Sequence, residues 1–276
     1  MVKIGTLFVV ATPIGNLSEM TPRAIDVLNS VDLIACEDTR VTKNLCHHFN
    51  ISKPLLSTHE HNEIFSSIKI IEKILEGKNV ALVSDAGYPG ISDPGNKVII
   101  KAIDCDIKVE VISGPCAIIN ALVGSGLPSD RFYFHGFLKS KSTDRIKELK
   151  TLIDRSETLI FYEAPHRIKD SLEDMALILG KERRACICRE LTKKFEEYIR
   201  GNLEELIYKA SFGLKGEMVV VVEGQTLREQ VTISRSEILQ EIDSKISKGM
   251  SAKDAINEVA KMHNLSKNEV YRLYHQ

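Results

Sequence analysis

Several features that would assign this chain to a common class are missing from its sequence. No run approaches the roughly eighteen consecutive apolar residues of a membrane-spanning helix. The N-terminal segment lacks the charged region, apolar core and cleavage site of a secretory signal peptide. The six cysteines form no C-x-x-C pair and mostly lie in apolar runs, as is typical of reduced, buried thiols. These absences predict a cytoplasmic protein with no membrane partner.

An excess of charge of one sign and the common nucleotide-binding motifs are also missing. The 37 Lys and Arg residues nearly balance 38 Asp and Glu, for a net charge of −1. Any RNA contact must therefore come from local basic patches. The first predicted strand, 7–11, is followed by Thr12-Pro13-Ile14-Gly15, which is neither the G-x-G-x-x-G of dinucleotide-binding folds nor a G-K-[ST] P-loop. Neither class of nucleotide site is therefore expected.

The sequence does contain a regular alternation of strands and helices. Strands are predicted at 7–11, 33–36, 80–84 and 109–113, and helices at 22–29, 40–49, 63–75 and 95–103. Thr39 is expected to cap the second helix, with Asp38 as the alternative. This order predicts an N-terminal α/β domain over residues 1–125, built on a parallel, doubly wound sheet.

A Gly- and Pro-containing segment at 124–130 predicts a hinge between domains. Beyond it, strands are predicted at 132–136, 158–162, 185–189 and 218–223, and helices at 141–155 and 168–179. They indicate a second α/β domain, 126–225, with a mixed or antiparallel sheet.

The third predicted piece is a helical tail, 226–276. Its segment 251–271 has helix-turn-helix spacing, with Ser266 able to cap the later helix. The balanced charges of the tail favour packing or RNA contact over promoter recognition.

The most informative motif is the loop S-D-A-G-Y-P-G-I-S-D-P-G at 84–95, which follows an apolar strand. Three glycines and two prolines in twelve residues predict a rigid turn whose backbone is not covered by side chains at the glycines. The carboxyl end of a parallel strand is where open α/β sheets bind ligands. Similar turns follow two other predicted strands, at 12–15 and 113–117. We expect all three to form the floor of one cleft.

Polar clusters also end apolar strands, at 36–40, 163–167 and 189–194, and are expected to form walls of the site. Basic residues concentrate at 139–155 and 181–200, either as solvated helix faces or as contacts to an anionic substrate. The pair His59 and His61 has no evident third ligand, so no metal is expected.

Taken in order, these motifs resemble a known family. V-x-x-T-P-I-G-N-L, C-E-D-T-R, S-D-A-G-x-P-G-I-S-D-P-G, S-G-P, F-Y-E-A-P-H-R and R-E-L-T-K are similar to motifs of the ribosomal RNA small subunit methyltransferase I family, in the tetrapyrrole methylase superfamily. The resemblance covers about residues 7–224. It implies a two-domain α/β homodimer that uses S-adenosylmethionine to methylate the 2′-oxygen of a cytidine in the decoding region of 16S rRNA in the small ribosomal subunit. The superfamily also methylates tetrapyrrole carbons, and a precorrin or uroporphyrinogen methyltransferase is the alternative.

The resemblance also implies which residues contact the cofactor. They are Pro13, Ile14, Asp85, Ala86, Gly87, Tyr88, Ala117, Ile118, Tyr162, Leu191, Glu217 and Met218.

The remaining candidates lie on the substrate side of the cleft. Arg40, Arg167 and Arg189 are expected to hold the RNA, the last two through phosphates. Because a 2′-hydroxyl is weakly acidic, a base or a nearby cation should help the reaction. Lys193 and His166 are the preferred candidates, and Glu163 is a third.

Overall fold

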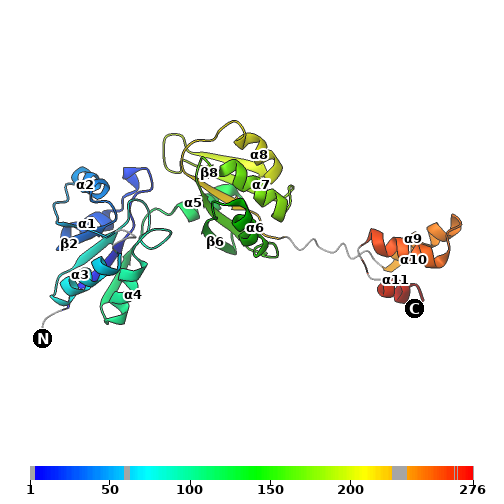
Figure 1. The fold of residues 1–276 in the computed structure, drawn as a ribbon, viewed down its shortest axis with the longest axis horizontal. Helices are drawn as coiled ribbons and strands as arrows, with labels where there is room; N and C mark the ends of the chain where they lie inside the picture. The colour runs from blue at the N-terminus through cyan, green and yellow to red at the C-terminus, as the bar shows by residue number, and fades with distance from the viewer. Residues whose placement is uncertain (1–3, 59–62, 226–234, 264, 266, 276) are drawn as a thin grey trace. The chain divides into compact units, whose positions relative to one another are not determined.

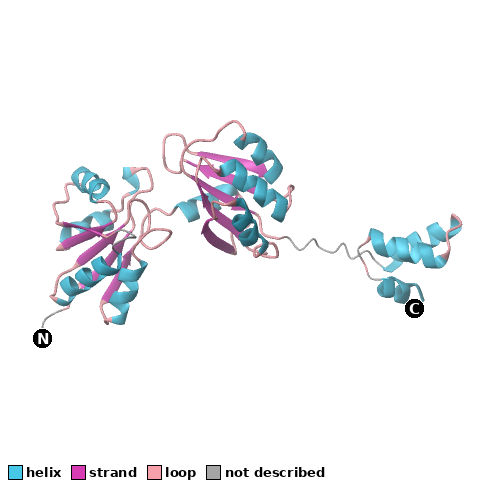
Figure 2. Ribbon diagram, in the orientation of Figure 1, coloured by secondary structure: helices cyan, strands magenta, loops and turns pink. Residues whose placement is uncertain are grey.

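The computed structural model of the chain describes residues 4–58, 63–225, 235–263, 265 and 267–275. The chain divides into two compact units, Met1–Gln225 and Thr226–Gln276. The first unit contains two five-stranded sheets with helices on their faces (Figures 1 and 2). The α/β class predicted from the alternating pattern is confirmed.

The first sheet is entirely parallel, in the order β3-β2-β4-β1-β5. Its strands are β1 (Thr6–Val10), β2 (Leu33–Cys36), β3 (Leu55–Ser57), β4 (Val80–Val83) and β5 (Lys108–Ile112). Residues of α1 (Pro22–Ser30) and α2 (Thr39–His48) pack in the core of one face, and those of α3 (Glu63–Leu75) and α4 (Asn96–Asp104) in that of the other. A short 3-10 helix, η1 (Leu17–Glu19), precedes α1. Because β4, β1 and β5 are neighbours, the turns that follow them emerge side by side.

The second sheet is mixed, in the order β6-β7-β10-β8-β9, and β6–β7 is its one parallel pairing between neighbouring strands. Its strands are β6 (Phe132–Phe137), β7 (Thr158–Glu163), β8 (Arg184–Arg189), β9 (Glu197–Asn202) and β10 (Met218–Val222). Helices α6 (Ser142–Lys150), α7 (Ile168–Leu179) and α8 (Leu203–Ala210) contribute to the core on one face. Helix α5 (Ala117–Ser125) packs against the other face, which is the side that carries the site.

The structure corrects several local expectations. The sequence pattern does not predict β3, α5, β9 or α8, and the helix expected at 141–155 ends at Lys150. The N-cap of α2 is Asp38, whose carboxylate accepts a hydrogen bond from the Arg40 N–H at 2.8 Å, so Thr39 is the first helical residue. Asp38 lies in extended backbone, and a carboxylate is a stronger N-cap acceptor than a threonine hydroxyl.

The described residues of the second unit form three helices around a small core of their own. Its helices are α9 (Arg235–Ser247), α10 (Ala252–Met262) and α11 (Lys267–His275). The buried core residues are Ile238, Ile242, Ala255, Ile256, Val259, Ala260 and Val270. Ser251 caps α10 by accepting from the Asp254 N–H, whereas Ser266 lies outside the described residues. None of the described helices combines a membrane-spanning length with an apolar sequence.

Candidate functional site

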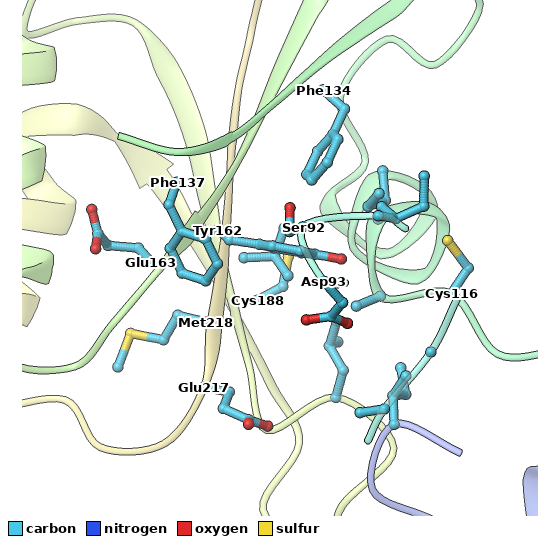
Figure 3. Close-up of a pocket in the computed structure, with 18 of the residues that line it drawn as sticks. Ser92, Asp93, Cys116, Phe134, Phe137, Tyr162, Glu163, Cys188, Glu217 and Met218 are labelled. Carbon is cyan, nitrogen blue, oxygen red and sulfur yellow. The ribbon is translucent and has the colours of Figure 1, made fainter. Parts of the chain in front are cut away.

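A cavity of about 600 Å³ opens where the turns after β1, β4 and β5 meet the second sheet (Figure 3). Its volume lies within the roughly 300–1,000 Å³ typical of small-molecule sites. The lining residues are Ile14, Ala86, Gly87, Tyr88, Ile91, Ser92, Asp93, Cys116, Ala117, Ile118, Phe134, Phe137, Tyr162, Glu163, Ala164, Pro165, Cys188, Leu191, Glu217, Met218 and Val219. Both sheets therefore contribute to one mostly apolar site.

The three turns of the first sheet are joined directly to one another. Thr12 and Gly87 exchange backbone hydrogen bonds of 2.9 and 3.0 Å, which link the turn after β1 to the loop after β4. Gly87 has φ +74, a conformation that favours glycine. The Tyr88 hydroxyl accepts from the Gly114 N–H at 3.1 Å, which links the same loop to the turn after β5. The expectation that three turns form one floor is confirmed.

A buried glutamate at the start of α3 holds the far end of the 84–95 loop. Glu63 Oε1 accepts from the backbone N–H groups of Gly95 at 2.9 Å and Lys97 at 3.2 Å. Lys97 Nζ lies 3.3 Å from Glu63 Oε2. Burial raises the pKa of Glu63, but these hydrogen bonds outweigh burial and leave it below its ordinary value. Glu63 thus fixes the loop from outside the cavity.

Aromatic side chains form the wall contributed by the second sheet. The ring of Tyr162 meets Phe134 edge-on, with centroids 5.0 Å apart, and lies 5.4 Å from the ring of Phe137. Burial raises the pKa of Tyr162 to about 12, so its phenol is neutral at physiological pH. Phe137 is 54% exposed despite lining the cavity. A wall of this kind suits flat rings.

The first turn of α5 lines the opposite side. Its N-cap residue, Cys116, makes no side-chain capping hydrogen bond, and Ala117 and Ile118 follow at the cavity surface. The leading N–H groups of a helix have no intrahelical acceptor and lie at the positive end of its dipole. A ligand carboxylate is the kind of group that this helix end accommodates.

The R-E-L-T-K motif forms a tightly folded loop beside the cavity. Glu190 and Thr192 adopt φ values of +52 and +66, rare for residues with these side chains. Lys193 Nζ lies 2.7 Å from Glu217 Oε2 and 3.2 Å from Glu190 Oε1. Burial lowers the pKa of Lys193, but hydrogen bonds to Glu217 and Glu190 outweigh it and leave the pKa raised. Lys193, which was predicted to act as a base or as a nearby cation, is therefore a fixed cation at neutral pH.

A glycine of the first turn makes room for this lysine. Gly15 has φ +154, and a Cβ placed on it would lie 2.5 Å from Lys193 Cγ. The T-P-I-G and R-E-L-T-K motifs therefore pack directly against each other.

Glu163 lines the cavity, but its carboxylate points away from the other labelled residues in Figure 3. It accepts from the Ala164 N–H at 2.8 Å, Arg167 Nε at 2.7 Å and Ser171 Oγ at 2.5 Å. These three donors occupy most of the acceptor sites of the buried carboxylate. Glu163 therefore serves to connect β7 to α7 and to orient Arg167, and the geometry argues against the predicted catalytic role.

The other predicted catalytic and substrate residues lie outside the cavity lining. His166 is exposed. The Arg40 side chain is 88% exposed and paired with Asp38 at 2.6 Å. Arg189 donates from Nε to Glu197 at 2.6 Å and from Nη1 to the Lys215 carbonyl at 3.0 Å. Arg40 and His166 are thus open to a large substrate, whereas Arg189 is held by the protein.

Ten of the twelve predicted cofactor residues line the cavity, and two do not. Pro13 is buried beneath the first turn. Asp85 is exposed, and its Oδ1 accepts from the Asp38 N–H at 3.1 Å. Asp85 therefore connects the loop after β4 to the turn after β2, and the polar contact expected of it is not directed into the cavity.

The carboxylate that does enter the cavity is Asp93, which the sequence reasoning missed. It is half-buried, follows Ser92 with its φ of +62, and lies near Tyr162 in Figure 3. Burial, followed by the nearby charges of Glu37 and Asp85, raises the pKa of Asp93 to about 6. The available signal was the second aspartate of S-D-A-G-Y-P-G-I-S-D-P-G.

Within the part of the chain that the structure describes, no three His, Cys, Asp or Glu side chains are grouped as metal ligands would be. His59 and His61 lie outside the described residues.

Comparison with known proteins relates this chain to methyltransferases. The family described as Tetrapyrrole (Corrin/Porphyrin) Methylases matches residues 6–207. The chain is 48% identical to Ribosomal RNA small subunit methyltransferase I of Bacillus subtilis, with 99% of this chain and 94% of that protein covered. The protein of the same name from Vibrio cholerae is 45% identical, with coverage of 96% and 93%.

Solved structures similar to the chain are more distant in sequence. A uroporphyrin-III-C-methyltransferase from Thermus thermophilus has a TM-score of 0.58 and 19% identity, covering 79% of this chain and 94% of that one. A precorrin-6Y methylase from Archaeoglobus fulgidus has a TM-score of 0.55 and 19% identity, covering 80% and 100%. At this identity the likeness concerns the fold alone.

Proposed function

Because this chain belongs to the tetrapyrrole methylase family, and within it to the ribosomal RNA small subunit methyltransferase I group, we propose that it methylates the ribosomal RNA of the small subunit with S-adenosylmethionine as donor. The observation that carries this proposal is the 42–48% identity to those relatives along nearly the whole chain. The acceptor that we propose is the 2′-oxygen of a cytidine in the decoding region of 16S rRNA, as the sequence motifs imply.

The residues of the cavity fit S-adenosylmethionine. The uncapped first turn of α5 suits its carboxylate, and the wall of Tyr162, Phe134 and Met218 suits its adenine and thioether portions. Gly87 has no side chain, so the backbone of the 86–88 segment can approach a ligand closely. We assign the donor to this cavity, where the twelve residues implied by the motifs either line its surface or, as with Pro13 and Asp85, support the turns.

When bound, S-adenosylmethionine supplies a methyl group on a positively charged sulfur, and transfer of that group removes the charge. The protein's contribution is then alignment and exclusion of water rather than supply of an electrophile. The joined turns fix one side of the site, and the apolar wall keeps it dry. Lys193, held by Glu190 and Glu217, provides a fixed positive charge at the edge.

The RNA is proposed to contact both α/β parts of the first unit, at Arg40 beside the first sheet and at basic residues of the second. Arg40 and Arg167 are the proposed phosphate contacts, and the basic segments 139–155 and 181–200 add local positive charge to a chain that is neutral overall. Arg189 supports this face through Glu197. The half-exposed ring of Phe137 offers a stacking surface for an unpaired base. We also propose that the protein acts as a homodimer in the cytoplasm, as the resemblance implies.

The test is methyl transfer from labelled S-adenosylmethionine to three acceptors: 30S subunits lacking the modification, protein-free 16S rRNA and uroporphyrinogen. Incorporation into either RNA acceptor, with none into uroporphyrinogen, is expected. Incorporation into the tetrapyrrole alone would contradict the proposal and support the tetrapyrrole alternative.

A further inference from the structure

The cavity is too small to admit an RNA helix. Its volume of about 600 Å³ suits a small molecule, yet the acceptor oxygen must come within about 3–3.5 Å of the donated methyl group. The target nucleotide therefore has to reach the cavity as part of an unpaired strand. The bases beside it then lose their stacking partners, and proteins commonly replace these with aromatic side chains.

The loop between β8 and β9, residues 190–196, presents one exposed aromatic ring beside the cavity. Phe195 is 67% exposed. It lies four residues after Leu191, which lines the cavity. A single exposed phenylalanine is common on protein surfaces, but three features of this loop point to a binding role: its position, its rigidity and its charges.

The pairing register of the second sheet places this loop at the same end of the sheet as Phe137, on the opposite edge. Phe137 at the end of β6 pairs with Tyr162 on β7, and Met218 on β10 pairs with Arg189, after which the loop begins. Four strand spacings of about 4.8 Å each separate β6 from β9. Residues of β7, β10 and β8 between these edges line the cavity. The cavity therefore lies between the two exposed phenylalanines.

The loop holds Phe195 in a fixed position. The Lys193 N–H donates to the Glu190 carbonyl at 3.0 Å, and the Glu196 N–H donates to the Lys193 carbonyl at 3.1 Å. Glu196 Oε2 accepts from the Thr192 N–H at 2.5 Å. Strain such as that of the left-handed Glu190 and Thr192 is found mainly at functional sites. A ring held in this way can stack on a ligand with little further loss of conformational freedom.

The charges of the loop leave one cation free at its exposed end. The ion pairs of the loop are Arg189–Glu197, Lys193–Glu190 and Lys193–Glu217. Lys194 has no carboxylate partner among the residues that the structure describes, and its Nζ lies 5.6 Å from the centroid of the Phe195 ring. Sites for single-stranded nucleic acid combine such groups, with the ring stacking on a base and the cation near the backbone.

Resting on the proposed function, we infer that Phe195 is a substrate-binding residue that stacks on an unpaired RNA base beside the target cytidine, with Lys194 at the adjoining phosphate. Phe137 and Phe195 then hold the strand at two points on either side of the cavity. The nucleotide between them is free to turn its ribose toward the donor.

The test uses the absence of tryptophan from this chain. Phe195→Ala removes the ring, whereas Phe195→Trp keeps an aromatic ring and introduces a single indole. Phe212→Ala and Phe212→Trp are the matched controls, because Phe212 is 73% exposed and follows α8, which packs on the face of the second sheet opposite the site.

Four quantities are measured on the same preparations. They are KM and kcat with 30S subunits, S-adenosylhomocysteine affinity by calorimetry, the mass in solution by light scattering, and indole emission as 30S subunits are added. Subunits mixed with wild type, which has no indole, provide the blank for the emission.

We expect Phe195→Ala to raise the KM for 30S subunits by about 5- to 100-fold, the effect of losing one stacked base. Its kcat, its mass and its S-adenosylhomocysteine affinity should match the wild type. Phe195→Trp should restore the KM, and its emission should fall as the indole stacks on a base. Both Phe212 variants should behave as wild type, with constant emission. Lys194→Gln should reduce the slope of log affinity against log salt concentration by about one.

Several outcomes would overturn the inference while the proposed function stands. They are a KM for Phe195→Ala equal to that of Phe212→Ala, or emission from Phe195→Trp that 30S subunits leave unchanged. A lower mass of Phe195→Ala would place the ring against a second copy of the chain, and a loss of S-adenosylhomocysteine affinity would place it on the cofactor. An unchanged salt slope in Lys194→Gln would remove Lys194 from the site. A wild-type protein that binds S-adenosylhomocysteine but methylates no 30S subunit would refute the proposed function itself, and with it this role.

Discussion

The buried contact between Glu63 and the loop after β4 gives a prediction in which stability and binding change together. Replacing Glu63 with Ala removes the acceptor for two backbone N–H groups, those of Gly95 and Lys97, and the partner of the Lys97 ammonium. Hydrogen bonds to charged groups contribute about 1.5–3 kcal/mol each, and water can replace part of this at the exposed Lys97. We therefore expect a loss of about 2–4 kcal/mol in the free energy of unfolding.

The same change should loosen the loop, which contributes Ala86, Gly87, Tyr88, Ile91, Ser92 and Asp93 to the cavity. Affinity for S-adenosylhomocysteine is expected to fall by about tenfold or more, equivalent to about 1.4 kcal/mol. The fold lowers the pKa of Glu63 from its ordinary 4.5. The contribution of Glu63 to the free energy of unfolding is therefore complete above pH 4.5, and it is lost as the pH falls through the pKa of the folded state.

Urea denaturation and calorimetry on one preparation measure both effects. Glu72→Ala, at an exposed position of the same helix, is the control and should change neither quantity. The reasoning is refuted if Glu63→Ala matches this control in stability and in affinity.

Three further predictions concern other parts of the molecule. Phe137→Ala should raise the KM for 30S subunits by about tenfold, because one stacked base is lost. The affinity for S-adenosylhomocysteine should be retained, and its loss would show that the ring contacts the cofactor instead. Asp174→Ala leaves the buried Arg145 without its 2.7 Å partner and should lower the free energy of unfolding by about 3–5 kcal/mol, measured by denaturation; a change below about 1 kcal/mol would show that Arg145 is solvated. A chain that ends at Gln225 keeps both cores of the first unit. In calorimetry these residues should unfold at the same melting temperature as in the full-length chain. A lower melting temperature would show that the tail stabilises them.

Much of the fold could be predicted from local pattern. The bounds of β2, α3 and α7 agree with the sequence prediction, because each combines a clear apolar run or helical periodicity with polar flanks. Strand β3 is only three residues long, and α5, AIINALVGS, is apolar on nearly every side, so neither has a periodic signal. Edge strand β9, EYIRGN, depends on pairing with β8 rather than on its own composition.

The sequence could predict which loops meet at the site, because their positions follow from the order of the strands. It could not predict the direction in which individual side chains point. Strands β4, β1 and β5 lie side by side, so the turns that follow them had to meet. The loop after β4 contains two similar aspartates, and only its folded path directs Asp93 rather than Asp85 into the cavity. For Glu163, the donors on Ala164, Arg167 and Ser171 could not be read from the sequence. The homodimer, the domain boundary at 125 and the RNA contacts stay predictions.

The central claim is that this chain places a methyl group on a ribose oxygen of small-subunit RNA. It is tested most directly by mapping 2′-O-methylation along 16S rRNA by primer extension, on unmodified 30S subunits incubated with S-adenosylmethionine with and without the protein. The account predicts one new protein-dependent stop, at a cytidine in the decoding region. A map identical with and without active protein, or a new stop only outside that region, would contradict it.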